Sequence, residues 1–355
     1  MKICFFNTVK SWGGGEKWHL DHALGFACAG HDVTIVSNKN SELIQRATIN
    51  KMRTVAFPIH NLSFLNPFKL HALYKFFKRE KFDIVVLNFS TDLKTAAFPA
   101  KRAGIPKIVY RRGSDIPIKN SFINRFLFGK CLTDVLANSK ATKRSILQKN
   151  SDLFPADKIK VIYNGIDTNL TEEEKISHDI PVVGCLARLV HQKGIDILLD
   201  IAAILKNRNV NCKIKIGGDG PLKEELLQQA KNKNLSDYVE FIGFVNDSSK
   251  FMRQLDVFVL TSRWEGFGYV LAETMLAKNP IVAFDVSSNP ELVFDETNGY
   301  LIPFNNNEAF ADAIQKLIAQ PNTRKTFGDA GYTIVKEKFD FEKNKNLVIQ
   351  YLTAN

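Results

Sequence analysis

The sequence lacks both a long apolar run and a regular spacing of cysteines. Its apolar runs fall well short of the roughly 18 residues that a membrane-spanning helix needs. The first of them, Ile3 to Phe6, is too short for a signal peptide and has the length of a buried strand. We therefore expect a cytoplasmic protein. Without a CxxC pair, a disulfide framework and a zinc site are excluded, and the five cysteines are expected to be reduced, buried thiols: Cys4, Cys28, Cys131, Cys185 and Cys212.

Acidic residues are scarce in the first half of the chain. Residues 1–178 contain 28 Lys and Arg against 15 Asp and Glu, whereas residues 179–355 contain 20 against 22. An excess of positive charge confined to one half indicates an anionic partner there. The alternative is an ordinary lysine-rich surface. No pattern typical of a nucleic-acid reader accompanies the charge, so nucleic acid is not the expected partner.

The alternation of predicted strands and helices along the chain predicts two doubly wound α/β domains. A length of 355 residues exceeds what one core usually holds. Short apolar runs alternate with segments of helical period, as in parallel sheets. The predicted strands are Lys2–Phe6, Asp32–Val36, Asp83–Leu87, Lys107–Tyr110, Thr133–Ala137, Pro181–Leu186, Lys213–Ile216, Val239–Ile242, Val257–Leu260 and Ile281–Ala283. We place a linker at Thr171–Lys175, a charged stretch poor in apolar residues, between domains at 1–168 and 179–338.

Three predicted strands of the second half are each followed by a polar segment that contains glycine. These segments are residues 187–194, 217–221 and 261–268. Because ligands of open α/β sheets bind outside the carboxyl ends of the strands, we expect the three segments to line one site. Pro221, at the end of the second segment, suits the first turn of a helix. Alone, the second segment is only a turn signal, so the prediction depends on the three together.

The residue types in these segments suit a diphosphate. Arg188 and Lys193 bring two positive charges to one edge of the sheet. Gly266 and Gly268 allow backbone N–H groups at a helix N-terminus to approach an anion closely. Stabilising the charge that develops on a departing group is usually the largest catalytic contribution. Taken singly, each of these residues could equally be a solvated surface group.

Two glutamates complete the pattern, Glu265 in the third segment and Glu273 in the helix after it. Their carboxylates could accept hydrogen bonds from the paired hydroxyls of ribose or hexose. The sequence Glu265-Gly-Phe-Gly-Tyr-Val-Leu-Ala-Glu273 resembles the signature of the retaining glycosyltransferases of the GT-B fold, in particular glycosyltransferase family 4, or group 1, of the lipopolysaccharide and polysaccharide type. Further similar segments are Gly13–Glu16, Asn138-Ser139, Asn164–Asp167, the GDGP turn at 218–221 and Asn289–Glu291.

The resemblance implies two Rossmann-like domains that face a crevice, with a nucleotide-diphosphate sugar bound by the second domain and a glycan or lipid-linked acceptor by the first. It assigns catalysis to Arg188, Lys193 and Glu265, and donor binding to Gly14, Gly15, Gly218, Gly220, Gly243, Phe244, Val245, Gly266, Phe267, Gly268 and Glu273. Residues 339–355 would include a helix, Phe341 to Leu352, that crosses back to the first domain. No cofactor is expected, and no metal, because Arg188 and Lys193 can take over its electrostatic role.

One departure from the family concerns the acceptor. Many relatives have a histidine after the strand predicted at Lys107–Tyr110, where this chain has Arg111 and Arg112. We expect these arginines to hold an anionic acceptor or the donor phosphates rather than to transfer a proton. In such enzymes the departing phosphate itself is commonly described as taking the acceptor proton, so no protein base is required.

Two segments of the first half have the composition of a basic amphipathic helix. Phe64–Arg79 and Ser121–Lys130 both interleave aromatic and aliphatic residues with Lys and Arg. Such helices lie on anionic membrane surfaces, which would place the protein on the inner face of the cytoplasmic membrane. The alternative is a pair of crossover helices that pack their aromatic stripes on the sheet.

Other functions are compatible with part of the pattern. A nucleotide-sugar epimerase of the same fold does not account for the paired glutamates, and a non-catalytic sugar-nucleotide binding protein does not require every charged position. A dinucleotide dehydrogenase would need GxGxxG after the first strand, a spacing that Gly13–Glu16 lacks.

Overall fold

The computed structural model describes residues 1–169 and 174–354. The predicted linker at Thr171–Lys175 falls in part on residues 171–173, which lie outside the described residues. The chain forms two compact units: unit 1 comprises Met1–Asn164 and Glu342–Asn355, and unit 2 comprises Gly165–Phe341.

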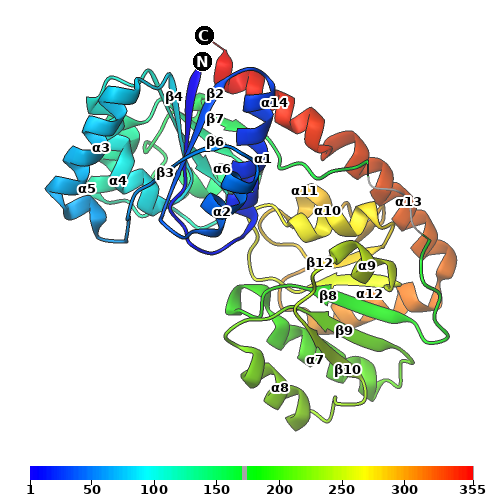
Figure 1. Ribbon diagram of the computed structural model, residues 1–355. Helices are drawn as coiled ribbons and strands as arrows, with labels where there is room; N and C mark the ends of the chain where they lie inside the picture. The colour runs from blue at the N-terminus through cyan, green and yellow to red at the C-terminus, as the bar shows by residue number, and fades with distance from the viewer. Residues whose placement is uncertain (170–173, 355) are drawn as a thin grey trace. The chain divides into compact units, whose positions relative to one another are not determined.

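Unit 1 is built on a parallel sheet of seven strands in the order β3-β2-β1-β4-β5-β6-β7 (Figure 1). The strands are β1 (Lys2–Phe6), β2 (Asp32–Ser37), β3 (Arg53–Ala56), β4 (Ile84–Leu87), β5 (Lys107–Arg112), β6 (Asp134–Ala137) and β7 (Ile159–Val161). The helices are α1 (Gly14–Cys28), α2 (Glu42–Ile49), η1 (Ser63–Leu65), α3 (Pro67–Glu80), α4 (Ser90–Arg102), α5 (Phe122–Phe126), η2 (Leu127–Cys131), α6 (Lys140–Leu147), η3 (Ala156–Lys158) and α14 (Phe341–Thr353).

Unit 2 is built on a parallel sheet of six strands in the order β10-β9-β8-β11-β12-β13. The strands are β8 (Val182–Leu186), β9 (Lys213–Gly217), β10 (Val239–Gly243), β11 (Val257–Leu260), β12 (Ile281–Phe284) and β13 (Gly299–Ile302). The helices are η4 (His191–Lys193), α7 (Ile195–Asn207), α8 (Lys223–Asn232), α9 (Ser248–Arg253), α10 (Tyr269–Leu276), α11 (Asn289–Leu292), α12 (Asn307–Ala319) and α13 (Pro321–Lys338). Both units are Rossmann-like, which confirms the predicted fold class.

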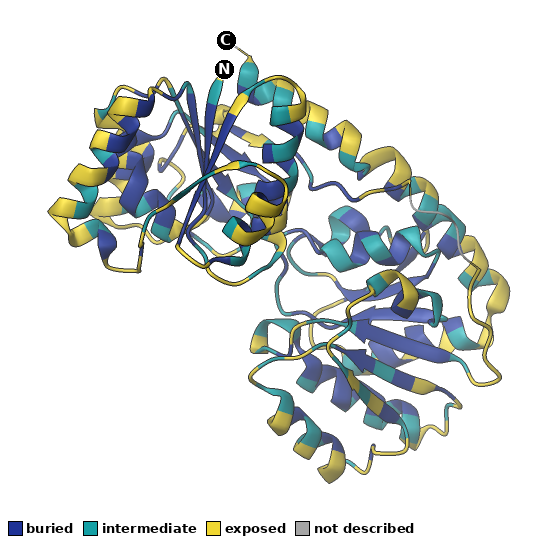
Figure 2. Ribbon diagram, viewed as in Figure 1, coloured by how far each residue is buried: buried dark blue, intermediate teal, exposed yellow. Residues whose placement is uncertain are grey.

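The five inner strands of unit 1, from β2 to β6 in the sheet order, are buried on both faces, as Figure 2 shows. In β1, Ile3 and Phe5 belong to the core beneath α1, α2 and α14, whereas Cys4 and Phe6 belong to the core beneath α3, α4 and α6. This division follows from the alternation of side chains along a strand. Because helices cover both faces of the parallel sheet, such a strand requires a continuous run of apolar residues.

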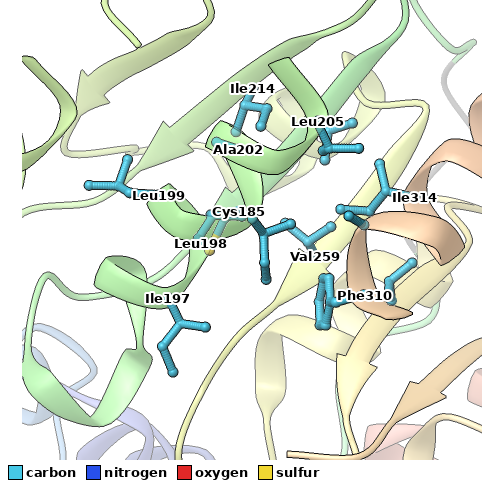
Figure 3. Close-up of a cluster of buried hydrophobic side chains, with 14 of the residues drawn as sticks. Cys185, Ile197, Leu198, Leu199, Ala202, Leu205, Ile214, Val259, Phe310 and Ile314 are labelled. Carbon is cyan, nitrogen blue, oxygen red and sulfur yellow. The ribbon is translucent and has the colours of Figure 1, made fainter. Parts of the chain in front are cut away.

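The largest core of unit 2 lies between its sheet and the helices α7, α8 and α12. Figure 3 shows part of it, where α7 and α12 meet the central strands through ten labelled residues: Cys185, Ile197, Leu198, Leu199, Ala202, Leu205, Ile214, Val259, Phe310 and Ile314. Burying such aliphatic side chains stabilises a fold by about 1.5–3 kcal/mol each.

Two passages of the chain between the units lie side by side. The backbone N–H of Ile166 donates to the Phe339 carbonyl at 2.8 Å, and the N–H of Phe341 donates to the Ile166 carbonyl at 2.9 Å. Gly165 is required here because a Cβ at that position would overlap the backbone of Phe341. Beyond this point α14 packs on unit 1, where the Lys107 ammonium group donates to the Tyr351 carbonyl at 2.8 Å.

All ten predicted strands are present, within one or two residues of their predicted bounds. The three strands that were not predicted, β3, β7 and β13, lie at sheet edges and have only three or four residues each. The prediction that all five cysteines are buried was wrong for Cys28, which is exposed because it is the last residue of α1.

Candidate functional site

The carboxyl ends of β8, β9 and β10 are joined by hydrogen bonds between their loops. The Ala187 N–H donates to the Gly217 carbonyl at 3.0 Å, and the Gly218 N–H donates to the Gly243 carbonyl at 2.7 Å. Gly218 has a φ of +135°, and a Cβ there would overlap the Ala187 carbonyl. The glycine at this position is therefore required for the close packing of two strand-end loops. Helix α8 begins at Lys223, so Pro221 lies in the turn before it rather than in its first turn.

A buried ion pair joins the loop after β8 to the loop after β11. The Lys193 ammonium group lies 2.5 Å from Glu265 Oε1, and the Ser262 hydroxyl donates to the same oxygen at 2.7 Å. The Glu265 side chain is only 6% exposed and that of Lys193 17% exposed. Because a buried carboxylate is costly without compensation, these two donors account for its position. The structure thus brings together two of the residues assigned to catalysis.

A second ion pair fastens the same two loops. The Arg263 guanidinium donates to Asp196 Oδ1 at 2.9 Å and to Oδ2 at 2.5 Å, and also to the His191 carbonyl at 2.8 Å. The Arg263 N–H donates to the Gln192 carbonyl at 2.8 Å. These bonds lower the pKa of Asp196 below its usual range. Flanking Lys193 and Glu265, they restrict how far the two loops can separate.

Neither Arg263 nor Asp196 was predicted from the sequence to have a role. The only signal in the sequence was that Arg263 lies two residues before Glu265 and that Asp196 follows the first segment in the first turn of a helix.

Helix α10 begins shortly after Glu265, in the segment that follows β11. Its N-cap is Gly268, with a φ of +80° and no side-chain cap. Phe267 is 2% exposed and packs on Tyr269 and Phe339, so its side chain is not available to a ligand. Glu273 is half-buried in the second turn of α10, and Gly266 is half-buried before it.

The remaining donor residues of unit 2 border the same sheet edge less tightly. Arg188 is exposed, in contrast to Lys193. Gly243 ends β10 with a φ of +74°, and Phe244 after it is 71% exposed. Val245 contacts the β9 loop, because its Cγ2 lies 2.8 Å from where a Cβ of Gly217 would be. Gly220 packs on Leu189 in the same way.

Unit 1 also collects polar side chains at its strand ends. Gly14 and Gly15, assigned to the donor, form the first residues of α1, and Gly15 faces the Asn88 side chain. Beside them Glu16 is buried, and its Oε1 accepts a hydrogen bond from the Asn7 amide at 3.1 Å. Burial raises the pKa of Glu16, a shift that Asn7 and Arg111 partly oppose.

The two arginines assigned to an anion are both engaged by protein groups. Arg111 is 4% exposed, donates to Asn88 Oδ1 at 3.3 Å and to Asn164 Oδ1 at 3.1 Å, and lies 5.1 Å from the centre of the Trp18 ring. Arg112 is half-buried and donates to the Ile116 carbonyl at 2.6 Å. Their assignment to an anionic ligand stays a prediction.

Unit 1 buries three further ionisable side chains. Asp92 is fully buried and accepts hydrogen bonds from the Thr8 and Phe89 N–H groups, yet burial still raises its pKa to about 6. His19 and His22 are buried on α1, where desolvation lowers the pKa of each to about 3. Neither histidine is therefore suited to accept a proton near neutral pH.

Among residues 1–169 and 174–354, no group of three or more His, Cys, Asp and Glu side chains is arranged to hold a metal ion. Within the same part of the chain, no helix is both long and apolar enough to cross a membrane.

Two Rossmann-like α/β units in one chain are the architecture of the GT-B fold. The sequence profile of the group 1 glycosyl transferases matches residues 167–334, and that of glycosyltransferase family 4 matches residues 12–170. An uncharacterized glycosyltransferase of Methanocaldococcus jannaschii is 30% identical over 300 residues, which cover 80% of this chain and 81% of that protein. The chain belongs to the group 1 glycosyltransferases.

Two further proteins extend the comparison. The N-acetylgalactosamine-N,N'-diacetylbacillosaminyl-diphospho-undecaprenol 4-alpha-N-acetylgalactosaminyltransferase of Campylobacter jejuni is 29% identical over 251 residues, which cover 70% of this chain and 67% of that protein. The crystal structure of Anabaena HepE with UDP superposes over the full length of both chains with a TM-score of 0.86 at 24% identity, and HepE is also known with UDP-glucose. These relatives do not favour the epimerase or the non-catalytic binding protein.

Proposed function

We propose that the protein transfers a hexosyl-type sugar from a nucleoside-diphosphate sugar to an acceptor hydroxyl with retention of the anomeric configuration. The observation that carries this proposal is the Lys193–Glu265 pair, held at the strand ends of unit 2 between the Ser262 hydroxyl and the Arg263–Asp196 ion pair. The diphosphate is assigned to Lys193, Arg188 and the N-terminus of α10. No metal is required in this assignment, because protein cations neutralise the departing charge.

In the proposed reaction, the bond between the anomeric carbon and the phosphate oxygen breaks while a bond forms to the acceptor oxygen on the same face of the sugar. The acceptor proton passes to the departing phosphate, so the nucleoside diphosphate leaves with it. Glu265 is assigned to the sugar that moves, and Glu273 to the ribose hydroxyls. The low pKa values of His19 and His22 support a step without a histidine base.

For the acceptor, we propose a glycan or a lipid-linked glycan of bacterial surface-polysaccharide or lipopolysaccharide synthesis, bound by unit 1. The Campylobacter relative, named for a diphospho-undecaprenol acceptor, supports this choice. The UDP-glucose complex of HepE supports UDP-sugars as the first donors to test. In this proposal the protein works at the inner face of the cytoplasmic membrane without crossing it.

A donor panel tests the proposal directly. The purified protein is incubated with UDP-, GDP- and ADP-sugars, and release of the free nucleoside diphosphate is measured without an added acceptor and with one. We expect slow hydrolysis of one donor class. Conversion of the sugar without release of nucleoside diphosphate would indicate an epimerase, and binding without any turnover would indicate a non-catalytic protein.

The role of Glu273 is tested by Glu273→Gln, which keeps the shape of the side chain but removes its charge. Loss of a charge-assisted hydrogen bond should weaken binding of the nucleoside diphosphate by about tenfold or more in a calorimetric titration. Unchanged affinity would remove Glu273 from the donor site.

A further inference from the structure

One surface of unit 1 exposes large apolar side chains from three neighbouring helical segments. We call it the outer helical surface; its apolar members are Leu62, Leu65, Phe68, Phe98, Phe122 and Phe126. Phe68 is 84% exposed and Phe122 is 85% exposed, values far above what a packed aromatic side chain shows. They come from the segment that contains η1 and α3, from α4 and from α5.

The outer helical surface is continuous. The rings of Phe98 on α4 and Phe126 on α5 lie 5.7 Å apart. One turn earlier on α4, the Lys94 ammonium group lies 5.6 Å from the centre of the Phe64 ring in η1. Figure 1 shows α3, α4 and α5 beside one another at one side of the unit 1 sheet, and Figure 2 shows their outer faces as exposed.

Packing of the sheet does not account for these side chains. The same helices already provide their own buried aromatic residues, Phe76 and Phe77 from α3 and Phe128 from η2, which lie in the core. The alternative was that these are crossover helices whose aromatic residues pack on the sheet. It explains only the aromatic residues that are buried. It does not explain Phe68 and Phe122, which are exposed and face away from the core.

The charge around these side chains has one sign. Residues 61–131, all of them described, contain 14 Lys and Arg against four Asp and Glu. Of the four acids, Asp92 is fully buried and Glu80 is buried in ion pairs with Lys2 and Arg53. None of the acids is classed as exposed, whereas Lys75, Lys78, Lys101, Arg102, Lys119, Arg125 and Lys130 are.

We propose that the outer helical surface docks on an anionic lipid bilayer. Exposed rings enter the interface between headgroups and acyl chains, while the surrounding cations attract anionic headgroups. A soluble anionic polymer would use the cations but gain nothing from Phe68 and Phe122. This docking rests on the proposed function in one respect: it would hold the enzyme at the surface where a lipid-linked acceptor lies.

Co-sedimentation with vesicles tests the proposal on the full-length protein. The vesicles contain equal parts of phosphatidylglycerol and phosphatidylcholine, with pure phosphatidylcholine for comparison. We expect binding to the anionic vesicles at low ionic strength and release as salt is raised, because the interaction decays within a Debye length. Since each cation near an anionic leaflet is worth about fivefold in affinity, Lys75→Glu with Lys78→Glu should weaken binding by about 30-fold or more.

Matched variants separate the surface from net charge and general hydrophobicity. Lys39→Glu with Lys51→Glu makes the same charge change at two exposed lysines that flank α2, a helix whose buried residues pack on the opposite face of the sheet, and should bind more tightly than the first variant by at least about tenfold. Phe68→Ser with Phe122→Ser should weaken binding by about tenfold, whereas Ile49→Ser with Leu347→Ser should leave it within about twofold.

Three results would overturn the proposal: no binding of the wild type to anionic vesicles at low salt, equal losses in the two lysine variants, or binding that survives loss of Phe68 and Phe122. The last would indicate a soluble anionic partner. Donor hydrolysis is measured in parallel and should be unchanged by all four variants. Vesicle binding without hydrolysis of any donor would leave the docking surface standing and reject the proposed function alone.

Discussion

The two units have a similar strand order but differ in how ionisable side chains are placed near their strand ends. In each sheet the first strand lies between the second and the fourth, β1 between β2 and β4 and β8 between β9 and β11. Unit 2 places charges in ion pairs that link two loops, Lys193–Glu265 and Arg263–Asp196. Unit 1 instead buries Asp92, His19 and His22, and burial shifts the pKa of each in the direction that favours its neutral form.

This difference indicates a catalytic role for the charged residues of unit 2 and a structural role for the buried ionisable residues of unit 1. An ion pair compensates two full charges at the edge where a ligand arrives, and a ligand phosphate or hydroxyl can exchange with either partner. Burial favours the neutral form of Asp92, His19 and His22, so these groups act as polar parts of the framework of unit 1. We therefore expect catalysis to depend on the charges of unit 2 and acid sensitivity to depend on the buried groups of unit 1.

The largest effect is expected from Glu265→Gln in unit 2. The amide keeps the shape of the side chain but removes the charge that holds Lys193, so the ammonium group loses its fixed position at the sheet edge. We expect the rate of donor turnover to fall by about 10²- to 10³-fold, as when one preorganised electrostatic contact is removed. The measurement is release of nucleoside diphosphate at saturating donor.

Glu308→Gln is the matched control for that variant, because Glu308 forms its ion pair with Arg208 on the exposed side of α12. Turnover in the control should stay within about twofold of the wild type. If Glu265→Gln also stayed within that range, the ion pair would be structural and the comparison between the units would lose its main support.

The second effect concerns acid sensitivity in unit 1. The pKa of His22 is lowered to about 3 by burial, whereas an unfolded histidine titrates near 6.5. Its stabilising contribution is therefore complete above pH 6.5 and is lost as the pH falls toward 3. By pH 4.5 the wild type should lose about 3 kcal/mol of stability through His22, which His22→Gln should not lose. The glutamine still offers an N–H to the Trp18 carbonyl, which His22 Nδ1 contacts at 2.8 Å.

Denaturant unfolding between pH 7 and pH 4.5 measures this difference. In a Trp264→Phe background, the fluorescence reports on Trp12 and Trp18, both in unit 1. Asp92 acts in the opposite direction, because its raised pKa adds stability as the pH falls through about 6, but it is common to both proteins and cancels in the comparison. Parallel pH dependences would show that His22 is accessible to protons in the folded unit.

The sequence predicted the units unequally for a physical reason. Buried strands and glycine turns are local signals, so the strand ends of unit 2 and the position of Glu265 could be predicted from periodicity and motif. Pairings between distant segments leave no such signal: Arg263 and Asp196 are 67 residues apart, and Arg111 reaches Asn164 across 53 residues. The same limit explains why Arg111 was expected at a ligand surface although it is buried.

A smaller effect is expected from Arg263→Lys, because a lysine cannot make the bidentate contact to Asp196. Arg263 is a positioning residue, so loosening the two loops should lower kcat by about tenfold while KM for the donor changes little. Arg208→Lys is the control, since Arg208 contacts Asp312 and Glu308 in an exposed ion-pair network on α12. Equal losses in both variants, or a rise in KM with kcat unchanged, would contradict a positioning role.

Removal of divalent metal ions is expected to have no effect on turnover. If the cations of unit 2 carry the charge of the departing diphosphate, turnover should be the same in excess EDTA as in added magnesium or manganese. The comparison is made on the wild type and on Lys193→Ala in parallel. Lys193→Ala should be slow under both conditions, because the missing ammonium group is part of the protein. A wild type that loses all activity in EDTA and recovers it with manganese would show that a metal ion supplies this charge.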